Sequence, residues 1–212
     1  MRTFRWLAAA CAVAILPAVS AAQSVRGFDD SWFWGVKAGI ASFSTSQVEN
    51  ATAPLVGGEW LITRSRFGLY IAADQSFFTE NSGIEDFTGG EYQIEMKNLR
   101  RISAAGLFFP RTLGALRPYA GIGMALNWIG DAVPLSNFSS SDEAAYVERE
   151  VAERRDRASF VFMLGAQGQI GTVSPFAQVT MQPSHPGFLL NDRPVYFLEG
   201  GIRMNFGPSR ER

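Results

Sequence analysis

Apolar residues alternate with small or polar residues through most of this chain, and no other feature constrains its fold as strongly. Successive side chains of a β-strand point to opposite faces, so a period of two predicts strands. In each alternating segment one face is mostly bulky and apolar, and the other holds glycine, amide and charged residues. Eight segments show this pattern: 32–43, 56–63, 67–74, 92–109, 120–128, 160–169, 177–182 and 198–206.

The first half of segment 92–109 alternates less regularly than the rest. Continuous alternation would place Asn98 and Arg100 on the same face as the apolar side chains. A β-bulge near Arg100 would correct this, because one extra residue shifts the pattern to the other face. Such a bulge would also turn Glu95 and Lys97 away from the face that the alternation gives them.

The connections between the segments alternate in length. Residues 44–54, 79–91, 130–158 and 182–194 form long connections, and 64–65, 110–117 and 171–174 form shorter ones. Antiparallel strands joined in chain order place all the long connections at one end. Short periplasmic turns, longer external loops and an even strand number are typical of transmembrane β-barrels. A soluble lipocalin-like barrel is the alternative, with its apolar face inside.

Two features favour the membrane. The apolar faces stay bulky over four or five alternate positions, enough for an apolar band about 25 Å tall, whereas the many glycines opposite suit a crowded interior. Aromatic residues also gather at two levels, as the two interfaces of a bilayer require: Trp34, Phe67, Phe108 and Phe206 near the short turns, and Phe77, Trp128, Phe160 and Tyr196 near the long loops. The sequence therefore predicts an all-β protein, an eight-stranded antiparallel up-and-down transmembrane β-barrel with short periplasmic turns and long external loops.

The N-terminus has the features of an export signal. Arg2 and Arg5 precede an apolar stretch that ends in the small residues Ser20-Ala21-Ala22. The single cysteine, Cys11, lies in this stretch, so the mature chain has no thiol for disulfides or metal binding. We divide the chain into a signal peptide at 1–22, an N-terminal periplasmic segment at 23–31, the barrel at 32–206 and a periplasmic tail at 207–212.

The last strand carries the most specific local motif. In Glu199-Gly-Gly-Ile-Arg-Met-Asn-Phe206 a polar residue is followed by Gly201, and Met204 and Phe206 close the strand. This resembles the C-terminal β-signal that the outer-membrane assembly machinery recognises, although residues 207–212 follow the final aromatic. With the Pro118-Tyr-Ala-Gly-Ile-Gly123 strand and the export signal, the chain resembles the OmpA/OmpX-like superfamily of small outer-membrane barrels. The resemblance implies export to the cell outer membrane, contact with membrane lipids and lipopolysaccharide, and assembly by that machinery.

The inward faces of the predicted strands hold four acidic and four basic residues. The lumen of an eight-stranded barrel is just wide enough to be filled by side chains, and charges held there must be paired. We expect a polar plug of ion pairs with a structural role, extended by Gln167, Gln169, Gln178 and Thr180. A narrow channel or transporter for small solutes is the alternative. The eight residues are Lys37, Glu59, Asp74, Glu95, Lys97, Arg101, Glu199 and Arg203.

Motifs for catalysis and for cofactors are lacking in the sequence. His185 is the only histidine, and its pairing with Ser184 does not match the eight-stranded lipid A deacylases, which place a histidine and a serine two residues apart. No metal-ligand spacing or phosphate-binding glycine loop occurs, so we predict no catalytic, metal or cofactor site. A formal charge of −1 argues against nucleic acid as a partner.

The external loops are the remaining place for function. Residues 142–156 are rich in charge, and Glu150 stands four residues before Arg154, a spacing that stabilises a short exposed helix. A solvated loop is the alternative. Loops on a rigid scaffold often carry binding residues, so we expect a structural or surface-interaction protein whose loops contact lipopolysaccharide, cations or another surface ligand.

Overall fold

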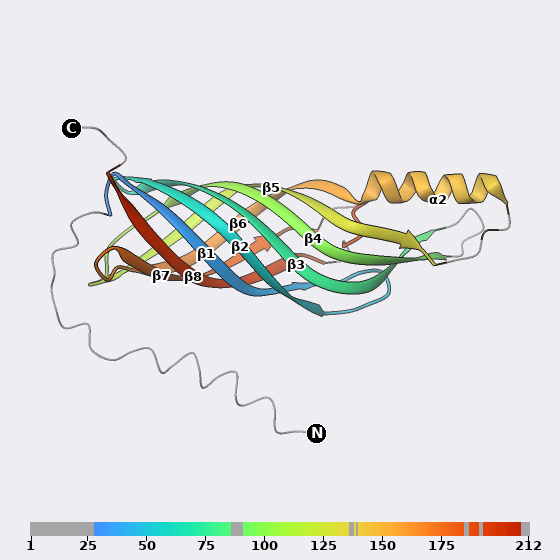
Figure 1. Ribbon diagram of the computed structural model, residues 1–212, viewed down its shortest axis with the longest axis horizontal. Helices are drawn as coiled ribbons and strands as arrows, with labels where there is room; N and C mark the ends of the chain where they lie inside the picture. The colour runs from blue at the N-terminus through green and yellow to red at the C-terminus, as the bar shows by residue number, and fades with distance from the viewer. Residues whose placement is uncertain are drawn as a thin grey trace, which may run out of the picture.

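A computed structural model describes residues 28–85, 91–135, 138, 140–184, 187–190 and 193–208. Eight strands, each hydrogen-bonded to the next, form a closed antiparallel barrel (Figure 1). Pairing of the first strand with the last closes the barrel, and in it Ser31 lies opposite Pro208. The predicted fold class is confirmed. The signal peptide assigned to 1–22 lies outside the described residues.

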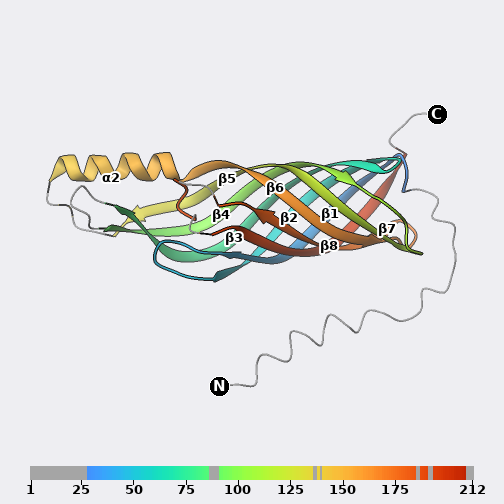
Figure 2. The same cartoon turned by 180° about the vertical axis from the view of Figure 1, so that it is seen from behind.

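The strands follow one another around the barrel in chain order. Their bounds are β1 Ser31–Phe43, β2 Ala51–Arg64, β3 Phe67–Glu85, β4 Glu91–Phe108, β5 Leu116–Pro134, β6 Asp156–Gly168, β7 Val173–Gln182 and β8 Val195–Pro208. The helix α2 Ser141–Arg154 lies at the end opposite to the start of β1 and the end of β8 (Figures 1 and 2). Among the described residues, no helix is both long and apolar enough to cross a membrane.

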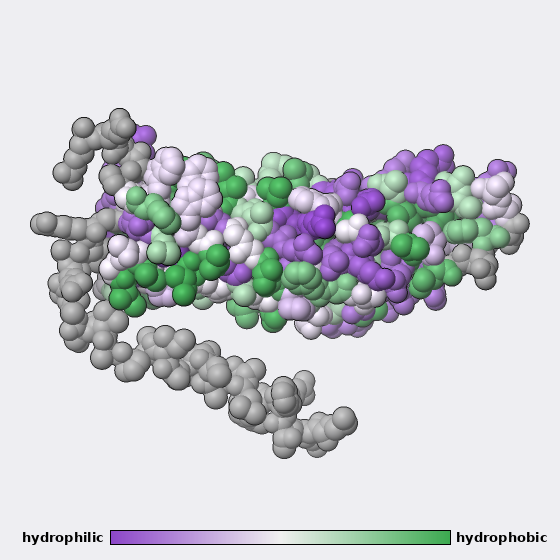
Figure 3. Space-filling model, viewed as in Figure 1, coloured by the Kyte–Doolittle hydropathy of each residue, from purple (hydrophilic) through white to green (hydrophobic). Residues whose placement is uncertain are grey.

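A belt of exposed apolar side chains surrounds the barrel. Ile122, Met124 and Leu164 are more than half exposed, as an outward face in lipid requires. Phe67 and Phe206, at the short-turn ends of β3 and β8, are also exposed, as are Phe160 and Tyr196 in the halves of β6 and β8 toward the long loops. Hydrophilic residues gather on the half of the molecule that carries α2, and apolar ones are more frequent toward the other end (Figure 3).

Side chains fill the barrel interior in three layers. An apolar cluster that includes Phe28, Phe33 and Phe109 closes the short-turn end. A second apolar cluster, which includes Phe43, Ile94 and Leu189, fills the long-loop end. A layer of buried polar and charged residues lies between them. Two strands pass close together where the inward residue is glycine: a Cβ on Gly123 would lie 2.0 Å from the carbonyl oxygen of Ala104.

Several strands extend further than the alternation predicts. Residues 79–85, expected in a long loop, continue β3 and pair with β4, and residues 130–134, also expected in a loop, continue β5. β3 and β5 have 19 residues each, whereas about 9–11 suffice to span a bilayer. The excess residues lie on the long-loop side, so the barrel continues beyond the apolar belt.

Where the barrel continues beyond the apolar belt, apolar side chains lie on the inward face of the strands and polar ones on the outward face. In β4, Leu99 and Arg101 point inward below Asn98, and Ile94 and Met96 point inward above it. Asn98 itself has a left-handed backbone, φ 59°, and β3 shifts register between Ser76 and Thr79. The bulge expected near Arg100 is therefore found at Asn98. Because water surrounds the strands above it, the apolar side chains turn inward there.

Candidate functional site: the barrel interior and the external lobe

Six of the eight predicted interior charges form one buried cluster, here called the central network. Three are acidic and three basic, so their formal charges cancel, and none is more than 7% exposed. Five different strands supply them, which places residues distant in the sequence side by side. The six are Lys37 of β1, Glu59 of β2, Asp74 of β3, Arg101 of β4, and Glu199 and Arg203 of β8.

Glu199 is the acceptor that most donors share. The Nζ of Lys37 and the Nη2 of Arg101 lie 2.7 Å and 2.6 Å from its Oε1. Its other oxygen, Oε2, accepts hydrogen bonds from Gln178 and Thr180, both at 2.9 Å. Four donors leave this carboxylate no free lone pair with which to act as a base or a metal ligand.

Asp74 holds the same two cations from the other side. Its Oδ1 lies 2.8 Å from the Nζ of Lys37, and its Oδ2 accepts two hydrogen bonds from Arg101, at 2.8 Å and 2.6 Å. Two carboxylates and two cations therefore alternate in a compact ring. Such mutual pairing offsets the high cost of removing each charge from water.

The second half of the network centres on Arg203, nearer the short-turn end. Its guanidinium donates to Glu59 and, at 2.5 Å, to the Oε1 of Gln167. Tyr70 joins the halves, because its hydroxyl accepts from Lys37 and donates to Glu59, both at 3.0 Å. The alternation places Tyr70 on the inward face. The partners of its hydroxyl come from other strands, so only the folded barrel shows that Tyr70 belongs to the network.

Aromatic rings cover both guanidinium groups. The Cζ of Arg101 lies 3.7 Å from the ring centroid of Phe197, and that of Arg203 lies 3.9 Å from that of Phe176. A cation over an aromatic face is attracted to the ring while water is kept away. The central network is thus sealed by rings as well as by the two apolar clusters.

Glu95 and Lys97 do not belong to this network, and the expectation that they face the interior is wrong. They form an ion pair of 2.8 Å with each other on the outer surface, where their side chains are 31% and 46% exposed. Both lie above Asn98, where the bulge has reversed the inward and outward positions. The hydrogen bond to Glu95 raises the pKa of Lys97. Gln169, expected in the plug, instead donates to Gly171 in the turn between β6 and β7.

The predicted assembly motif occupies both faces of β8. Glu199 and Gly201 face inward, and a Cβ on Gly201 would lie 2.2 Å from the carbonyl oxygen of Val36. Met204 and Phe206 face outward and are 50% and 66% exposed. The inward half of the motif therefore serves closure of the barrel, and the outward half lies in the apolar belt.

An external lobe stands on the long-loop end of the barrel. It consists of α2, the extended β3–β4 hairpin and residues 187–190, which share one apolar cluster. Val147 and Val151 of α2 are buried in it, and Tyr92 of β4 donates a hydrogen bond to Glu143. The predicted helix thus exists, with Glu150 and Arg154 2.7 Å apart. Its opposite face is polar and exposed.

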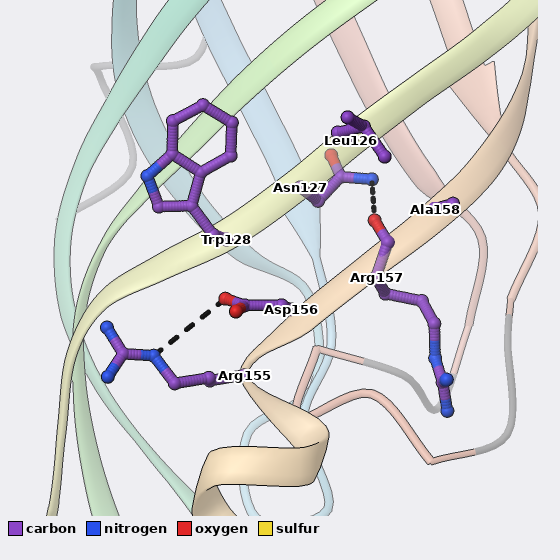
Figure 4. A pocket seen from close by; sticks show the side chains of 7 residues that line it. All are labelled: Leu126, Asn127, Trp128, Arg155, Asp156, Arg157 and Ala158. Carbon is purple, nitrogen blue, oxygen red and sulfur yellow. Dashed lines mark hydrogen bonds and ion pairs between the residues drawn. The ribbon is translucent and has the colours of Figure 1, made fainter.

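A groove opens on the outer surface between β5, β6 and the end of α2 (Figure 4). It encloses about 650 Å³ and is lined by Leu126, Asn127, Trp128, Arg155, Asp156, Arg157 and Ala158. Arg155 is fixed by hydrogen bonds of 3.1 Å to the carbonyl oxygens of Ile129 and Gly130. Arg155 also lies 3.8 Å from Asp156, so the groove joins an apolar wall in the belt to two arginines and one aspartate just above it.

The described residues contain no group of three or more His, Cys, Asp or Glu side chains that could hold a metal ion. His185 lies outside them. Its neighbour Ser184 lies in the connection from β7 to β8.

Comparison with solved structures identifies the fold. Neisserial surface protein A (NspA) has a TM-score of 0.54 and 14% sequence identity, covering 82% of this chain and 97% of its own. The outer membrane protein OprG from Pseudomonas aeruginosa has a TM-score of 0.51 and 12% identity, covering 84% and 98%. The chain has the fold of a small outer-membrane β-barrel. No protein-family model and no curated protein sequence matches it.

A third similar structure is Ail, the attachment invasion locus protein of Yersinia pestis, with a TM-score of 0.50, 11% identity and coverage of 84% of this chain and 99% of its own. Identities this low establish the architecture only. The apolar belt of this barrel adds an observation of its own, because a lipid bilayer is the environment that such a surface requires. The chain therefore combines the fold of small outer-membrane barrels with an outer surface suited to span a lipid bilayer.

Proposed function

We propose that this outer-membrane barrel has a non-catalytic, structural or surface-interaction role, and that the central network plugs its lumen. The observation that carries the proposal is the filled interior: paired charges lie between two apolar clusters, with the two buried guanidinium groups each covered by an aromatic ring. Side chains thus occupy the barrel from end to end. The network is a structural element of the fold.

A conducting pathway would have to break this arrangement. Separating one member of a buried, hydrogen-bonded ion pair from its partner costs about 3–5 kcal/mol. Glu199 alone has two charged partners and two neutral donors, so opening the lumen beside it requires the loss of several contacts together. These contacts favour the plug over a channel or transporter.

The external lobe is the proposed contact surface. Its apolar cluster fixes α2 on the barrel, and the exposed face of the helix presents charges of both signs, among them Glu148 and Arg149. A rigid, charged surface beyond the membrane suits contact with a surface ligand. The groove between β5 and β6 suits lipopolysaccharide, because an acyl chain can lie against Leu126 while Arg155 faces phosphate.

Delivery to the membrane completes the proposal. Residues 1–22 would direct export, and the end of β8, with Met204 and Phe206 exposed, would be recognised by the assembly machinery. Membrane lipids then cover the apolar belt.

Planar-bilayer recording tests the plug directly. The purified, folded protein should give no reproducible single-channel steps. The control for insertion artefacts is the same protein, heated until it no longer migrates as the compact, folded form in a detergent gel. Steps of constant size that appear with the folded protein and disappear on heating would establish the channel and overturn the plug.

A further inference from the structure

Two hollows lie next to each other at the short-turn end of β3, β4 and β5. The first is an apolar groove of about 580 Å³ on the outer face, here called the lipid groove. Its walls include Phe67, Phe108, Gly106, Ala120, Gly121 and Ile122. It lies within the apolar belt, at the level of the aromatic residues near the short turns.

The groove exists because small outward residues lie between bulky ones. Gly106 of β4 pairs with Leu69 of β3 on one side and with Ile122 of β5 on the other. A Cβ built on Gly106 would meet no atom within 4 Å, so the space in front of it is open. The lining continues from Gly106 and Ile122 to Phe67 and Phe108, at the ends of β3 and β4, so an extended acyl chain can lie along it.

The second hollow, of about 470 Å³, is basic and lies between the turns at the end of the same strands. It is lined by Arg66, Arg111 and Arg117 with a single acidic residue, Asp29, and by the hydroxyls of Ser65 and Thr112. Arg66 directly precedes Phe67 of the lipid groove, and its carbonyl oxygen accepts a hydrogen bond of 2.8 Å from the backbone N–H of Phe109. The two hollows therefore adjoin.

The charge of the basic hollow is not neutralised within it. Asp29 lies 3.5 Å from Arg117, whose guanidinium also lies 4.0 Å from the ring centroid of Phe28. The buried Nε of Arg117 has no hydrogen-bond partner among the described residues. Within the same residues Arg66 and Arg111 form no ion pair, and both are exposed. Two positive charges therefore remain for an anion from outside.

We propose that the lipid groove and the basic hollow together bind one phospholipid with a net negative phosphodiester headgroup. The acyl chain would lie against Gly106 and Ile122, and the phosphate would accept hydrogen bonds from Arg66 and Arg111. This end carries the short turns, so the bound lipid belongs to the periplasmic leaflet. An apolar groove that adjoins Arg66 and Arg111, which form no ion pair within the described ranges, matches a molecule with an apolar chain and an anionic head.

Electron paramagnetic resonance of spin-labelled lipids tests this site. The folded full-length protein is reconstituted in phosphatidylcholine vesicles with a small fraction of labelled phosphatidylglycerol or labelled phosphatidylcholine, and the immobilised fraction of each label is measured. The unmodified protein should immobilise phosphatidylglycerol preferentially. Arg66→Gln and Arg111→Gln should each lower the phosphatidylglycerol association constant up to about fivefold, and leave phosphatidylcholine unchanged.

Matched variants separate the two halves of the site. Gly106→Leu fills the groove and should reduce the immobilised fraction of phosphatidylglycerol. Gly58→Leu should not, because Gly58 is another exposed outward glycine, where a Cβ would meet only the carbonyl oxygen of Gly35, at 3.8 Å. Arg149→Gln, on the exposed face of α2, should leave the preference intact. Heat-dependent gel migration shows that each variant is folded.

Three results would overturn the proposal. The first is an unmodified protein that immobilises both labels equally, and the second is a double Arg66→Gln/Arg111→Gln variant that keeps the preference. The third is displacement of the labelled lipid by inorganic phosphate alone at millimolar concentration. That result would mean that the arginines bind a free anion rather than a lipid, whereas the proposal expects no displacement.

Discussion

Glu199 shows what a single residue does in the interior of this barrel. It contacts two cations and two neutral donors at 2.6–2.9 Å, and it helps to balance three basic against three acidic groups. In a medium of low dielectric constant this balance matters more than any one contact, because an unpaired charge there loses its hydration without compensation. The exposed pair of Glu95 and Lys97 keeps its water and lacks this sensitivity.

Replacing Glu199 by glutamine should therefore destabilise the folded barrel strongly. The amide keeps the shape and some hydrogen bonds, but the interior gains a net positive charge, and we expect a loss of about 3–5 kcal/mol. Urea unfolding in lipid vesicles measures it, with Glu95→Gln as the control that should change little.

A double variant shows whether charge balance is the cause. Lys37→Met combined with Glu199→Gln removes one charge of each sign, so it should lose less free energy of unfolding than Glu199→Gln alone. A double variant that is less stable than the single one would mean that individual contacts, and not neutrality, dominate the network.

At the scale of elements, β4 passes through two environments. Below Asn98, Ile102 and Phe108 face lipid, and above it Ile94 and Met96 face inward in one cluster with α2 and residues 187–190. The bulge makes this possible, because one extra residue reverses the faces without ending the strand. The external lobe is thus a small water-soluble core built on a membrane barrel.

Packing of Val147 and Val151 should determine how firmly α2 is held. Replacing either valine by alanine removes two buried carbon atoms and leaves a cavity, a local loss of about 2 kcal/mol. The equilibrium constant for local opening of the helix should rise about thirtyfold. The rate of trypsin cleavage after Arg149 and Arg154 in the folded protein measures this change.

The control for this experiment is Glu148→Ala, on the exposed face of α2, which should leave the cleavage rate close to that of the unmodified protein. Unchanged cleavage in both valine variants would show that α2 is held by contacts other than its apolar face.

The whole molecule combines an apolar outer belt with an interior of three layers. The belt determines where the barrel lies in the membrane, because charge within it is costly in proportion to depth. Met124 of β5 is 54% exposed inside the belt, and Leu135 is 51% exposed just beyond the end of the same strand. These two residues have similar exposure and differ in height.

An arginine at the two positions should therefore have different effects. Met124→Arg should destabilise the barrel in vesicles, reducing its free energy of unfolding by about 2–4 kcal/mol. Leu135→Arg should change the free energy of unfolding little. Denaturant titration of both variants in vesicles is the measurement. Equal losses, or efficient refolding of the unmodified chain in buffer without lipid, would contradict the outward orientation of Met124.

The sequence by itself determined the number of strands and, within the apolar belt, which face of each strand points outward. These follow from alternation, which is a local property: the pleat sends neighbouring side chains to opposite sides whatever the partner strand is. For this reason the six charges of the central network could be assigned to the interior from the sequence. Helical spacing likewise indicated a helix around Glu150 and Arg154.

Only the tertiary structure decided which interior groups meet and where the pattern reverses. Lys37 and Glu199 are 162 residues apart, and they touch only because β8 closes the barrel on β1 in one register. A bulge at Asn98 removed Glu95 and Lys97 from the interior, and the hollow beside Arg66 arises where separate turns come together. Register, closure and bulges depend on contacts between distant strands, and the alternation within one strand does not predict those contacts.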